Sequence, residues 1–479
     1  MATLLTPDLC VIGAGACGLA VAQAARRLGA SVVVAEKGDL GGASLRSGAI
    51  ALRALAAAAE RAVAGVGSGE FGVFAEAAPK VSFRRVHDHI AEIILRSAPE
   101  SAATKLIALG IELVKGTASF TDPKTVKVGD TSIQARRFVI ATGARTSLPD
   151  IPGLLSVPYF TPETIFDNTR KLTHLVIIGA GPMGIELALS YRRLGCEVTV
   201  VEKGRALAQT DPELADIALR RLKDEGVIVH EESAIVAIQA RSQGIGIVAR
   251  AKDEGLNLDA SHILVATARS ANLTELNLEA AKIRRSKVDP GMLSLSSSLR
   301  TTNPKVFAVG EAASHAPAAH LSSLEADLVV RAALLGQPVR YEPAAVARLT
   351  LTDPEIAEIG LSEPMARGRF KTGFSVLRAS YAENDRARAG RESMGVVKLI
   401  VSRSGQILGA GIAGAGAGEL AALFALAIAQ KIDAAKLADL AAPYPSYAEL
   451  ARMLGEKAIG TAKNTIWEKR RFALNRLLP

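Results

Sequence analysis

Short apolar runs and helix-like segments alternate near the start of the chain. Asp8–Ile12 is an apolar run of strand length, and the letters GAGACG follow it. Leu19–Leu28 then has the apolar spacing of a helix, and Ser31–Ala35 is a second strand-like run that leads to Glu36. Strand, glycine turn, helix and strand in this order predict one βαβ unit.

The same order occurs a second time in the middle of the chain. Leu175–Ile178 predicts a strand, the letters GAGPMG a turn, Ile185–Leu194 a helix and Glu197–Val201 another strand, with Glu202 directly after it. A repeated βαβ pattern predicts two dinucleotide-binding folds in one chain.

The segments between and after these units predict further elements. Leu52–Ala64 and Phe83–Leu109 have helical patterns, and strand-rich sequence then continues to Phe138–Arg145. From about Pro338 onward, strands such as Val396–Val401 alternate with alanine-rich helices. This last third predicts a separate α+β domain.

Length and composition agree with an α/β protein of several domains. The chain has 479 residues, of which 49% are hydrophobic and only 4% aromatic. Single cores stop growing at roughly 250–300 residues, and many small residues suit close packing of helices on sheets. We therefore predict an α/β fold.

The cysteine content and the first residues bear on location. Only Cys10, Cys17 and Cys196 occur, and each is isolated in the sequence, so we expect no metal site and no disulfide framework. The opening MATLLTPDLCVIGAG has no basic region before its first strand, which argues against a secretory signal. No apolar run reaches the ~18 residues of a membrane span. We expect a cytoplasmic protein.

The net charge of +9 raises the question of an anionic partner. The basic residues are scattered, and no zinc-finger spacing or RNA-binding signature accompanies them. We therefore expect no nucleic-acid partner, and an anionic cofactor or a membrane surface explains the charge more simply.

The first glycine motif has the spacing of a dinucleotide site. Gly13, Gly15 and Gly18 follow a predicted strand and open a helix. The first glycine permits the tight turn, the second the approach of a pyrophosphate and the third close helix packing. Glu36, at the end of the second strand, is placed to accept hydrogen bonds from a ribose diol.

The second motif repeats this chemistry with Gly179, Gly181, Gly184 and Glu202. A carboxylate at position 202 repels a 2′-phosphate and so favours NADH over NADPH. Lys203 and Arg205 follow closely and can pair with such a phosphate, so NADPH remains the alternative.

Taken together, the motifs resemble the flavoprotein disulfide reductases. They are GAGACG, the pair Gly41–Gly42, the letters ATGAR, the second motif GAGPMG and the GE of VFAVGEAA. Mercuric reductase and dihydrolipoamide dehydrogenase are the nearest types, and TDPEIAEIGLSE, Thr352–Glu363, resembles the start of that family's dimerisation domain. The resemblance covers essentially the full chain.

This resemblance implies a homodimer with FAD in the first fold and NAD(P)H in the second, hydride passing from nicotinamide to flavin N5. It implies an FAD-binding domain at 1–148 and 273–338, an NAD(P)-binding domain at 149–272, and a dimerisation domain with a basic C-terminal helix at 339–479. Beyond the first motif, the implied FAD-binding residues are Gly42, Thr142, Gly143, Arg269, Gly310 and Glu311. The family usually has Asp where Glu311 stands, and Gly where Ala268 stands.

One segment departs from the family in its chemistry. Gly41–Leu55, GGASLRSGAIALRAL, aligns with the family segment GGTCLNVGCIPSKAL, so that Ser44 and Ala49 stand in place of the two redox-active cysteines. Neither a hydroxyl nor a methyl group can form a disulfide or a thiolate. A dithiol relay is therefore excluded at these positions.

The family's acid–base histidine is also replaced. Pro443–Leu450, PYPSYAEL, aligns with the family's HPTxxE segment and places Tyr444 at the histidine and Glu449 at the residue that orients it. A phenol is a poor thiol base, but it can donate a hydrogen bond or stack on a planar acceptor. Packing at the dimer interface is the alternative role for Tyr444.

A cation near the flavin is retained in altered form. Arg53 replaces the lysine that pairs, in the family, with the glutamate matching Glu186. A cation there stabilises reduced anionic flavin, which favours a working rather than a structural cofactor. A surface ion pair is the alternative.

The tail, Lys463–Pro479, places Ile466, Trp467, Leu474, Leu477 and Leu478 on one arc of a helix. Such a helix can rest peripherally on the inner face of an anionic membrane, or it can dock on its own protein or dimer partner.

The sequence therefore supports an enzyme that passes electrons from NAD(P)H through FAD to a non-disulfide acceptor, such as a quinone. The alternative is a flavin-bearing sensing protein that turns over little and binds a partner. Disulfide or mercuric reduction is less well supported, because both need thiolates.

Overall fold

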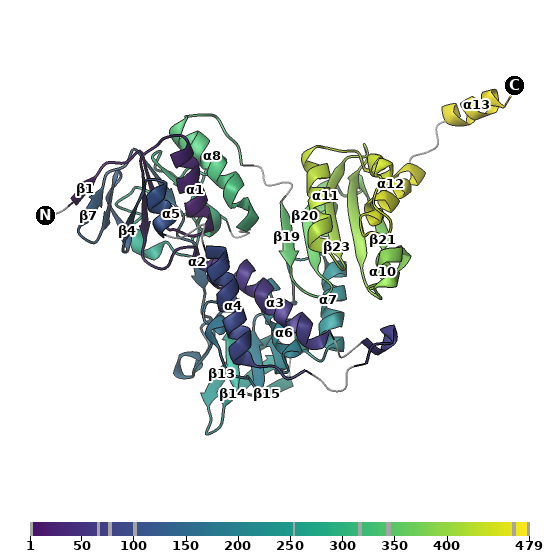
Figure 1. Ribbon diagram of the computed structural model, residues 1–479, viewed down its shortest axis with the longest axis horizontal. Helices are drawn as coiled ribbons and strands as arrows, with labels where there is room; N and C mark the ends of the chain where they lie inside the picture. Colours follow the sequence, from purple (N-terminus) through teal and green to yellow (C-terminus); the bar gives the residue numbers. More distant parts are fainter. Residues whose placement is uncertain are drawn as a thin grey trace. The chain divides into compact units, whose positions relative to one another are not determined.

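The computed structural model describes residues 3–64, 68–74, 79–98, 103–251, 254–314, 319–341, 346–461 and 466–476. The chain forms two compact units (Figure 1). Unit 1 consists of Met1–Lys203 and Val227–Glu342, and unit 2 of Gly204–Gly226 and Pro343–Pro479.

A five-stranded parallel sheet forms the first half of unit 1. Its strands, in spatial order, are β18 (Val306–Ala308), β8 (Arg137–Ile140), β2 (Leu9–Ile12), β3 (Val32–Glu36) and β4 (Ile111–Lys115). Helices α1 (Ala16–Arg27) and α8 (Ser322–Leu334) pack together on one face, against Val11 and Val34. Their neighbours Ile12 and Val33 point to the other face, because successive side chains of a strand alternate.

That other face is covered by a smaller sheet. Its strands are β1 (Thr3–Leu5), β7 (Thr131–Ile133), β6 (Thr125–Val128) and β5 (Ala118–Asp122). Phe120 of β5 packs edge-on against Phe138 of β8, and both rings are fully buried. Both faces of the parallel strands are therefore covered, which explains why these strands are almost continuously apolar.

The second half of unit 1 repeats this plan. The parallel strands are β12 (Ile228–His230), β11 (Glu197–Val201), β10 (His174–Ile178) and β16 (His262–Val265), and α6 (Pro182–Arg193) connects β10 to β11. An antiparallel sheet of β13 (Ser233–Ala240), β14 (Ile245–Ala251) and β15 (Glu254–Ala260) packs on it. The two βαβ units predicted from the sequence are thus confirmed as elements.

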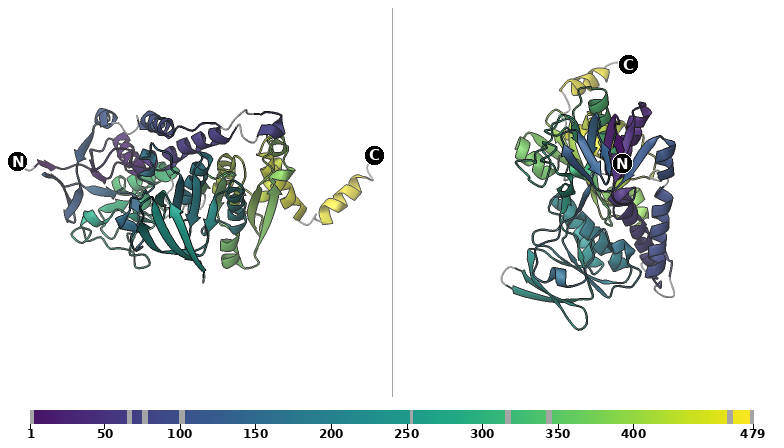
Figure 2. Two further views of the ribbon diagram at one scale, coloured as in Figure 1. Left: turned by 90° about the horizontal axis from the view of Figure 1, so that it is seen from below. Right: turned by 90° about the vertical axis from the view of Figure 1, so that its left-hand side faces the viewer.

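A short two-stranded antiparallel ribbon is formed by β9 (Ala144–Thr146) and β17 (Arg269–Ala271). Helices α2 (Gly42–Arg46), α3 (Ala49–Val63), α4 (Phe83–Ser97) and α5 (Ala103–Ala108) complete unit 1. Helices α3 and α4 lie side by side, and α3 also packs against α6 (Figures 1 and 2).

The single helix predicted over Phe83–Leu109 is divided into two helices. Helix α4 ends at Ser97, where the N–H of Ala98 bonds to Leu95 O, and α5 begins at Ala103. Pro99 follows Ala98 in the sequence, and a proline has no N–H for a helical hydrogen bond, so the sequence holds a chemical signal for this break.

Unit 2 is built on a five-stranded antiparallel sheet. The strands, in spatial order, are β19 (Ala347–Thr350), β20 (Ile356–Gly360), β23 (Ile407–Ala413), β22 (Val396–Ser402) and β21 (Phe374–Ser380). Helices α11 (Ala417–Ala429) and α12 (Glu449–Thr461) cover the face that presents Ala357 and Leu399. Helices α9 (Glu363–Phe370), α10 (Asp385–Ala389) and α13 (Ile466–Asn475) complete the unit.

Helix α7 (Pro212–Asp224) packs against β20 and β23 in unit 2. The side chains of Glu358 and Lys398 alternate with those facing α11 and α12. Glu358 accepts from the N–H of Asp211, the N-cap of α7, and Lys398 donates to the Asp211 carboxylate. The segment Gly204–Gly226 falls within the predicted NAD(P)-binding domain, 149–272. Its contacts, however, group it with unit 2.

Parallel sheets with connecting helices and a C-terminal α+β unit confirm the predicted fold class. Across the described ranges, every helix is too short or too polar to cross a membrane.

Candidate functional site

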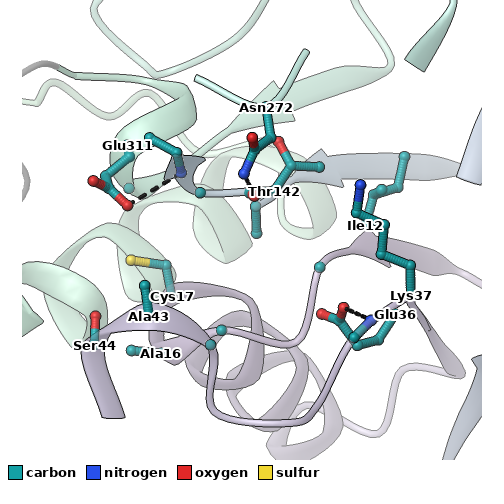
Figure 3. A pocket seen from close by; sticks show the side chains of 18 of the residues that line it. Ile12, Ala16, Cys17, Glu36, Lys37, Ala43, Ser44, Thr142, Asn272 and Glu311 are labelled. Carbon is teal, nitrogen blue, oxygen red and sulfur yellow. Dashed lines mark hydrogen bonds between the residues drawn. The ribbon is translucent and has the colours of Figure 1, made fainter. Parts of the chain in front are cut away.

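A cavity of about 650 Å³ opens in unit 1 at the carboxyl ends of β2, β3, β8 and β18. Figure 3 shows Glu36 toward one end of it and Cys17, Ser44 and Glu311 toward the other. Ligand sites of α/β sheets lie at this edge of the strands. The predicted residues on its wall are Gly13, Gly15, Glu36, Gly42, Ser44, Ala49, Thr142, Gly143, Arg269, Gly310 and Glu311.

The first glycine turn is shaped by contacts that only glycine allows. Gly13 has a φ of 109°, and a Cβ there would lie 2.3 Å from Ala141 O. A Cβ on Gly18 would lie 1.9 Å from Gly13 O, so Gly18 packs beneath the turn. A Cβ on Gly15 meets only Gly42 Cα, at 4.0 Å. The protein itself therefore leaves space at Gly15, in front of the first turn of α1.

The Gly41–Gly42 loop closes against this turn. Gly41 N donates to Ala14 O at 2.9 Å, and a Cβ on Gly42 would lie 2.9 Å from Gly15 Cα. The backbones of Gly15 and Gly42 thus lie against each other on the cavity wall. Neither residue has a side chain that would separate the backbone from a ligand.

Glu36 holds the other side of the turn through both carboxylate oxygens. Its Oε2 accepts from Ala14 N and its Oε1 from Gly38 N, both at 2.6 Å. Each oxygen retains a further lone pair, so the carboxylate can still accept hydroxyl donors such as a ribose diol.

Thr142 supplies a polar atom without a partner. Its Oγ1 is buried and makes no hydrogen bond to any described residue, while its carbonyl accepts from Asn272 Nδ2 at 3.1 Å. A buried hydroxyl left unbonded costs about 1–3 kcal/mol. A polar ligand in the cavity is the simplest partner for it, because Thr142 lies on the wall.

Arg269 joins two carboxylates beside the cavity. Its Nε donates to Glu311 Oε1 at 2.6 Å, and its Nη1 to Glu163 Oε1 at 2.8 Å. Burial disfavours the guanidinium charge, but Glu311 and Glu163 outweigh burial and raise the pKa of Arg269. Burial likewise opposes the charge of Glu163, yet hydrogen bonds and the charge of Arg269 lower its pKa.

Glu311 bonds to the protein through both oxygens, since its Oε2 also accepts from Ala144 N at 3.2 Å. The Glu311 carboxylate thus pairs with Arg269 while the residue remains on the cavity wall.

The second glycine turn reproduces the first. Gly179 has a φ of 107° and a would-be Cβ 2.6 Å from Ala266 O, and a Cβ on Gly184 would lie 2.1 Å from Gly179 O. At Gly181 a Cβ meets nothing within 4 Å. Glu202 Oε2 accepts from Ala180 N at 2.8 Å, as Glu36 does from Ala14. The three glycines and the glutamate of the second turn therefore make the same kinds of backbone contact as those of the first turn.

Ser44 on α2 and Ala49 at the start of α3 lie on the wall of the first cavity. Gly48 brings the two helices together, because its Cβ would be 3.1 Å from Ser44 Cα. Cys17 also lines the cavity and lies 3.2 Å from Ser322 Oγ. Burial raises the pKa of its thiol to about 11, so it is protonated and unreactive near neutral pH.

Arg53 lies one helical turn beyond Ala49 on α3 and is exposed, whereas Glu186 on α6 is 7% exposed. The two helices pack against each other. An ion pair between Arg53 and Glu186 stays a prediction.

Tyr444 and Glu449 lie in unit 2. The Tyr444 side chain is 73% exposed, and its hydroxyl donates to Asp385 Oδ2 at 3.0 Å. Glu449 begins α12 and accepts from Ser446 N at 3.4 Å.

The sequence did not point to Glu163, Asn272 or Asp385, although each bonds to a predicted residue. Their partners lie 106, 130 and 59 residues away along the chain, so no local spacing marks them.

Comparison with known proteins identifies the same two parts of the chain. Residues 7–332 match the family model described as pyridine nucleotide-disulphide oxidoreductase, and residues 346–454 match the model of its dimerisation domain.

Two curated relatives span nearly the whole chain. A mercuric reductase of Streptomyces lividans is 30% identical over 457 residues, which cover 94% of this chain and 95% of that protein. A dihydrolipoyl dehydrogenase of Geobacillus stearothermophilus is 32% identical over 467 residues, covering 94% and 96%.

A solved structure shares the fold. The Cu(II) complex of the HOCl-induced flavoprotein disulfide reductase RclA from Escherichia coli matches with a TM-score of 0.82 and 22% identity. The match covers 94% of this chain and 99% of that one.

Proposed function

The chain belongs to the pyridine nucleotide-disulphide oxidoreductase family, which binds FAD and NAD(P)H, and on that premise we propose that it reduces a non-disulfide acceptor such as a quinone. The observation that carries the proposal is Ser44 and Ala49 on the cavity wall. Since the three cysteines of the chain are at positions 10, 17 and 196, no thiol pair adjoins that wall. Electrons therefore leave without a dithiol relay.

The first cavity fits FAD. The open space at Gly15 and the first turn of α1 suit a pyrophosphate, the free lone pairs of Glu36 suit a ribose, and Thr142 Oγ1 offers an unused hydrogen bond. Bound there, FAD supplies hydride and electron transfer between NAD(P)H and the acceptor.

The second turn fits NAD(P)H by the same reasoning. Gly181 leaves room for a pyrophosphate, and Glu202 supplies the carboxylate for an adenosine ribose. We propose NADH as the preferred donor, because the carboxylate repels a 2′-phosphate. The ratio of kcat/KM for NADH and NADPH measures this preference.

The acceptor meets the wall formed by Ser44 and Ala49. These side chains are smaller than a disulfide, so a flat ring has room beside them. Arg53 lies one turn beyond Ala49 on α3, and we propose that its cation favours negative charge on the reduced cofactor. The resemblance supports Tyr444 of the partner subunit as the flank of the same site.

The match of residues 346–454 to a dimerisation domain supports a homodimer. For the domains we keep the proposed boundaries 1–148 with 273–338 for FAD, 149–272 for NAD(P) and 339–479 for dimerisation. Within 149–272, the contacts of Gly204–Gly226 tie that segment to unit 2.

Peripheral membrane contact of the tail suits a lipophilic quinone. Helix α13 is formed over Ile466–Asn475 and exposes Leu474, while Leu477 and Leu478 lie outside the described residues. Co-sedimentation with anionic vesicles, with and without residues 463–479, tests the proposal. Equal binding of both proteins contradicts it.

A steady-state acceptor comparison tests the proposed reaction. Purified FAD-loaded protein is given NADH with ubiquinone and menaquinone analogues, with lipoamide and with Hg(II). We expect turnover with quinones alone. Turnover only with lipoamide or Hg(II) overturns the proposal, and so does the absence of turnover with every acceptor.

A further inference from the structure

Tyr444 combines exposure with a fixed hydroxyl. Its ring is 73% exposed, yet its hydroxyl is held 3.0 Å from Asp385 Oδ2. An exposed side chain ordinarily moves among rotamers. The Asp385 carboxylate holds the Tyr444 ring in one orientation, so the ring is already ordered for contact with a molecule outside unit 2.

Asp385 is itself fixed. Its Oδ1 pairs with Arg388 Nη1 at 3.1 Å, and Arg388 Nε donates to Ala382 O at 2.8 Å. A backbone carbonyl thus orients the guanidinium, the guanidinium orients the carboxylate, and the carboxylate orients the phenol.

The segment that carries Tyr444 is tied to the same helix. The buried Asn384 donates from Nδ2 to Ser446 O at 2.9 Å and caps α10 by accepting from Ala387 N at 3.0 Å. The distance between Tyr444 and Asp385 is therefore set by the buried bond from Asn384 to Ser446 as well as by the exposed Tyr444–Asp385 bond itself.

The direction of the Tyr444 hydrogen bond decides its chemistry. A carboxylate can only accept, so the phenol hydrogen points at Asp385, and this bond together with the negative charge raises the pKa of Tyr444. The phenol stays neutral and holds its proton. What it presents outward is a pair of oxygen lone pairs, which accept hydrogen bonds.

We propose that Asp385 is a positioning residue that turns Tyr444 into a hydrogen-bond acceptor for the reduced acceptor, a hydroquinone. This inference rests on the proposed function. A quinone has carbonyl oxygens and no O–H, whereas its hydroquinone has two O–H donors. In the balanced reaction, NAD(P)H, one proton and quinone give NAD(P)⁺ and hydroquinone. The proton comes from solvent, because Tyr444 retains its own.

The test compares binding of product and substrate. The inhibition constant of the hydroquinone is divided by the KM of the matching quinone. In Tyr444→Phe this ratio is expected to rise about 3- to 10-fold, the value of one hydrogen bond. In Asp385→Ala the phenol hydrogen is free to donate to a quinone carbonyl, which lowers the KM of the quinone. The ratio is therefore expected to rise in this variant as well.

Tyr447→Phe is the matched control. Tyr447 also donates to a carboxylate, that of Glu392, but it is half-buried and packs on Tyr381. The ratio should be unchanged in this variant.

A second readout needs neither cofactor nor acceptor. The difference in tyrosinate absorbance between wild type and Tyr444→Phe reports the ionisation of Tyr444, and Asp385→Ala should shift it to lower pH. An unshifted titration overturns the positioning role of Asp385. An unchanged inhibition ratio in Tyr444→Phe, with quinone turnover intact, overturns the inference alone and leaves a packing role. Absence of quinone turnover in the wild type overturns the proposed function and the product-binding role together.

Discussion

Glycines with different contacts do different work at the two dinucleotide turns. Gly18 and Gly184 touch backbone so closely that any side chain would displace the turn, whereas Gly15 and Gly181 leave space that the protein does not fill. The φ values of Gly15 and Gly181, −76° and −72°, suit any residue. Substitution at the latter pair therefore tests the ligand and not the fold.

Gly15→Ala and Gly181→Ala are expected to separate the two sites. Gly15→Ala should lower FAD affinity at least about tenfold, because its methyl enters the space proposed for pyrophosphate. Gly181→Ala should retain FAD and raise the KM for NADH by a similar factor. Flavin absorbance per chain after desalting and initial rates measure the two effects.

Far-ultraviolet circular dichroism provides the control for folding of both variants. If Gly15→Ala keeps full flavin with unaltered affinity, the pyrophosphate does not pass in front of α1 and the assignment of this turn is wrong.

The sequence was sufficient to predict this residue-level geometry where the signal is local. Gly13, Gly15, Gly18 and Glu36 fall within one βαβ unit, and the same spacing identifies the second turn. The bond from Arg269 to Glu163 has no such signal, because it joins residues 106 positions apart through a ribbon whose pairing depends on the folded chain.

At the scale of elements, helix α7 shows what a hydrophobic pattern does not convey. Lys398 lies in the apolar run VVKLIVS and is 4% exposed, yet its Nζ lies 2.8 Å from Asp211 Oδ1. It also contacts Glu213 at 2.9 Å and Glu363 at 3.0 Å. A buried cation among carboxylates fastens the start of α7 to the sheet of unit 2, and its partners lie too far along the chain to be read from the strand.

Lys398→Met is expected to destabilise unit 2 by about 3–5 kcal/mol, because it leaves Asp211 buried without its cation. Chemical denaturation measures the loss. Lys436→Met is the control, since Lys436 pairs with Asp439 at the surface of the same unit and should cost under about 1 kcal/mol. Equal costs would contradict a structural role for the buried pair.

The same cluster predicts a dependence on acid. Burial opposes ionisation of Glu213 and Glu363, but hydrogen bonds from the neighbouring cations outweigh it and lower the pKa of both carboxyl groups below the usual range of a glutamate. A lowered carboxyl pKa contributes stability above the unfolded value, and this contribution is lost as the pH falls through the folded value.

Wild-type stability should therefore fall below about pH 4.5, and Lys398→Met should lose less over the same interval. Glu358 acts in the opposite sense, because burial raises its pKa, but both proteins contain it. Parallel pH profiles for wild type and variant would show that Lys398 does not control these carboxylates.

At the scale of the whole molecule, the chain keeps the fold of a disulfide-reducing family, and two of its three cysteines lie in the packed interior while Cys17 lies on the cavity wall. Cys10 and Cys196 are buried, and burial raises their pKa values to about 12 and about 11. The family fold could be predicted from the sequence, because its motifs stand in aligned segments of the chain. That Ser44 and Ala49 change the acceptor chemistry stays a proposal. The acceptor itself also stays a proposal, because the motifs mark the turns that hold dinucleotides and not the surface that an acceptor meets.

Thiol reagents are expected to leave turnover unchanged. NADH-reduced protein is treated with arsenite or N-ethylmaleimide and then assayed with a quinone, with a cysteine-containing relative as the positive control. Protonated, buried thiols react slowly. Strong inhibition by arsenite would reveal a working dithiol and contradict the proposed exit route.

Anaerobic stopped-flow absorbance of the FAD-loaded protein tests the central claim most directly. The protein is first mixed with NADH, then with either a quinone or lipoamide, and the visible flavin absorbance is followed. We predict loss of absorbance with NADH, rapid recovery with the quinone and none with lipoamide. Recovery with lipoamide at a rate equal to that with the quinone, or no loss of absorbance with NADH, would contradict it.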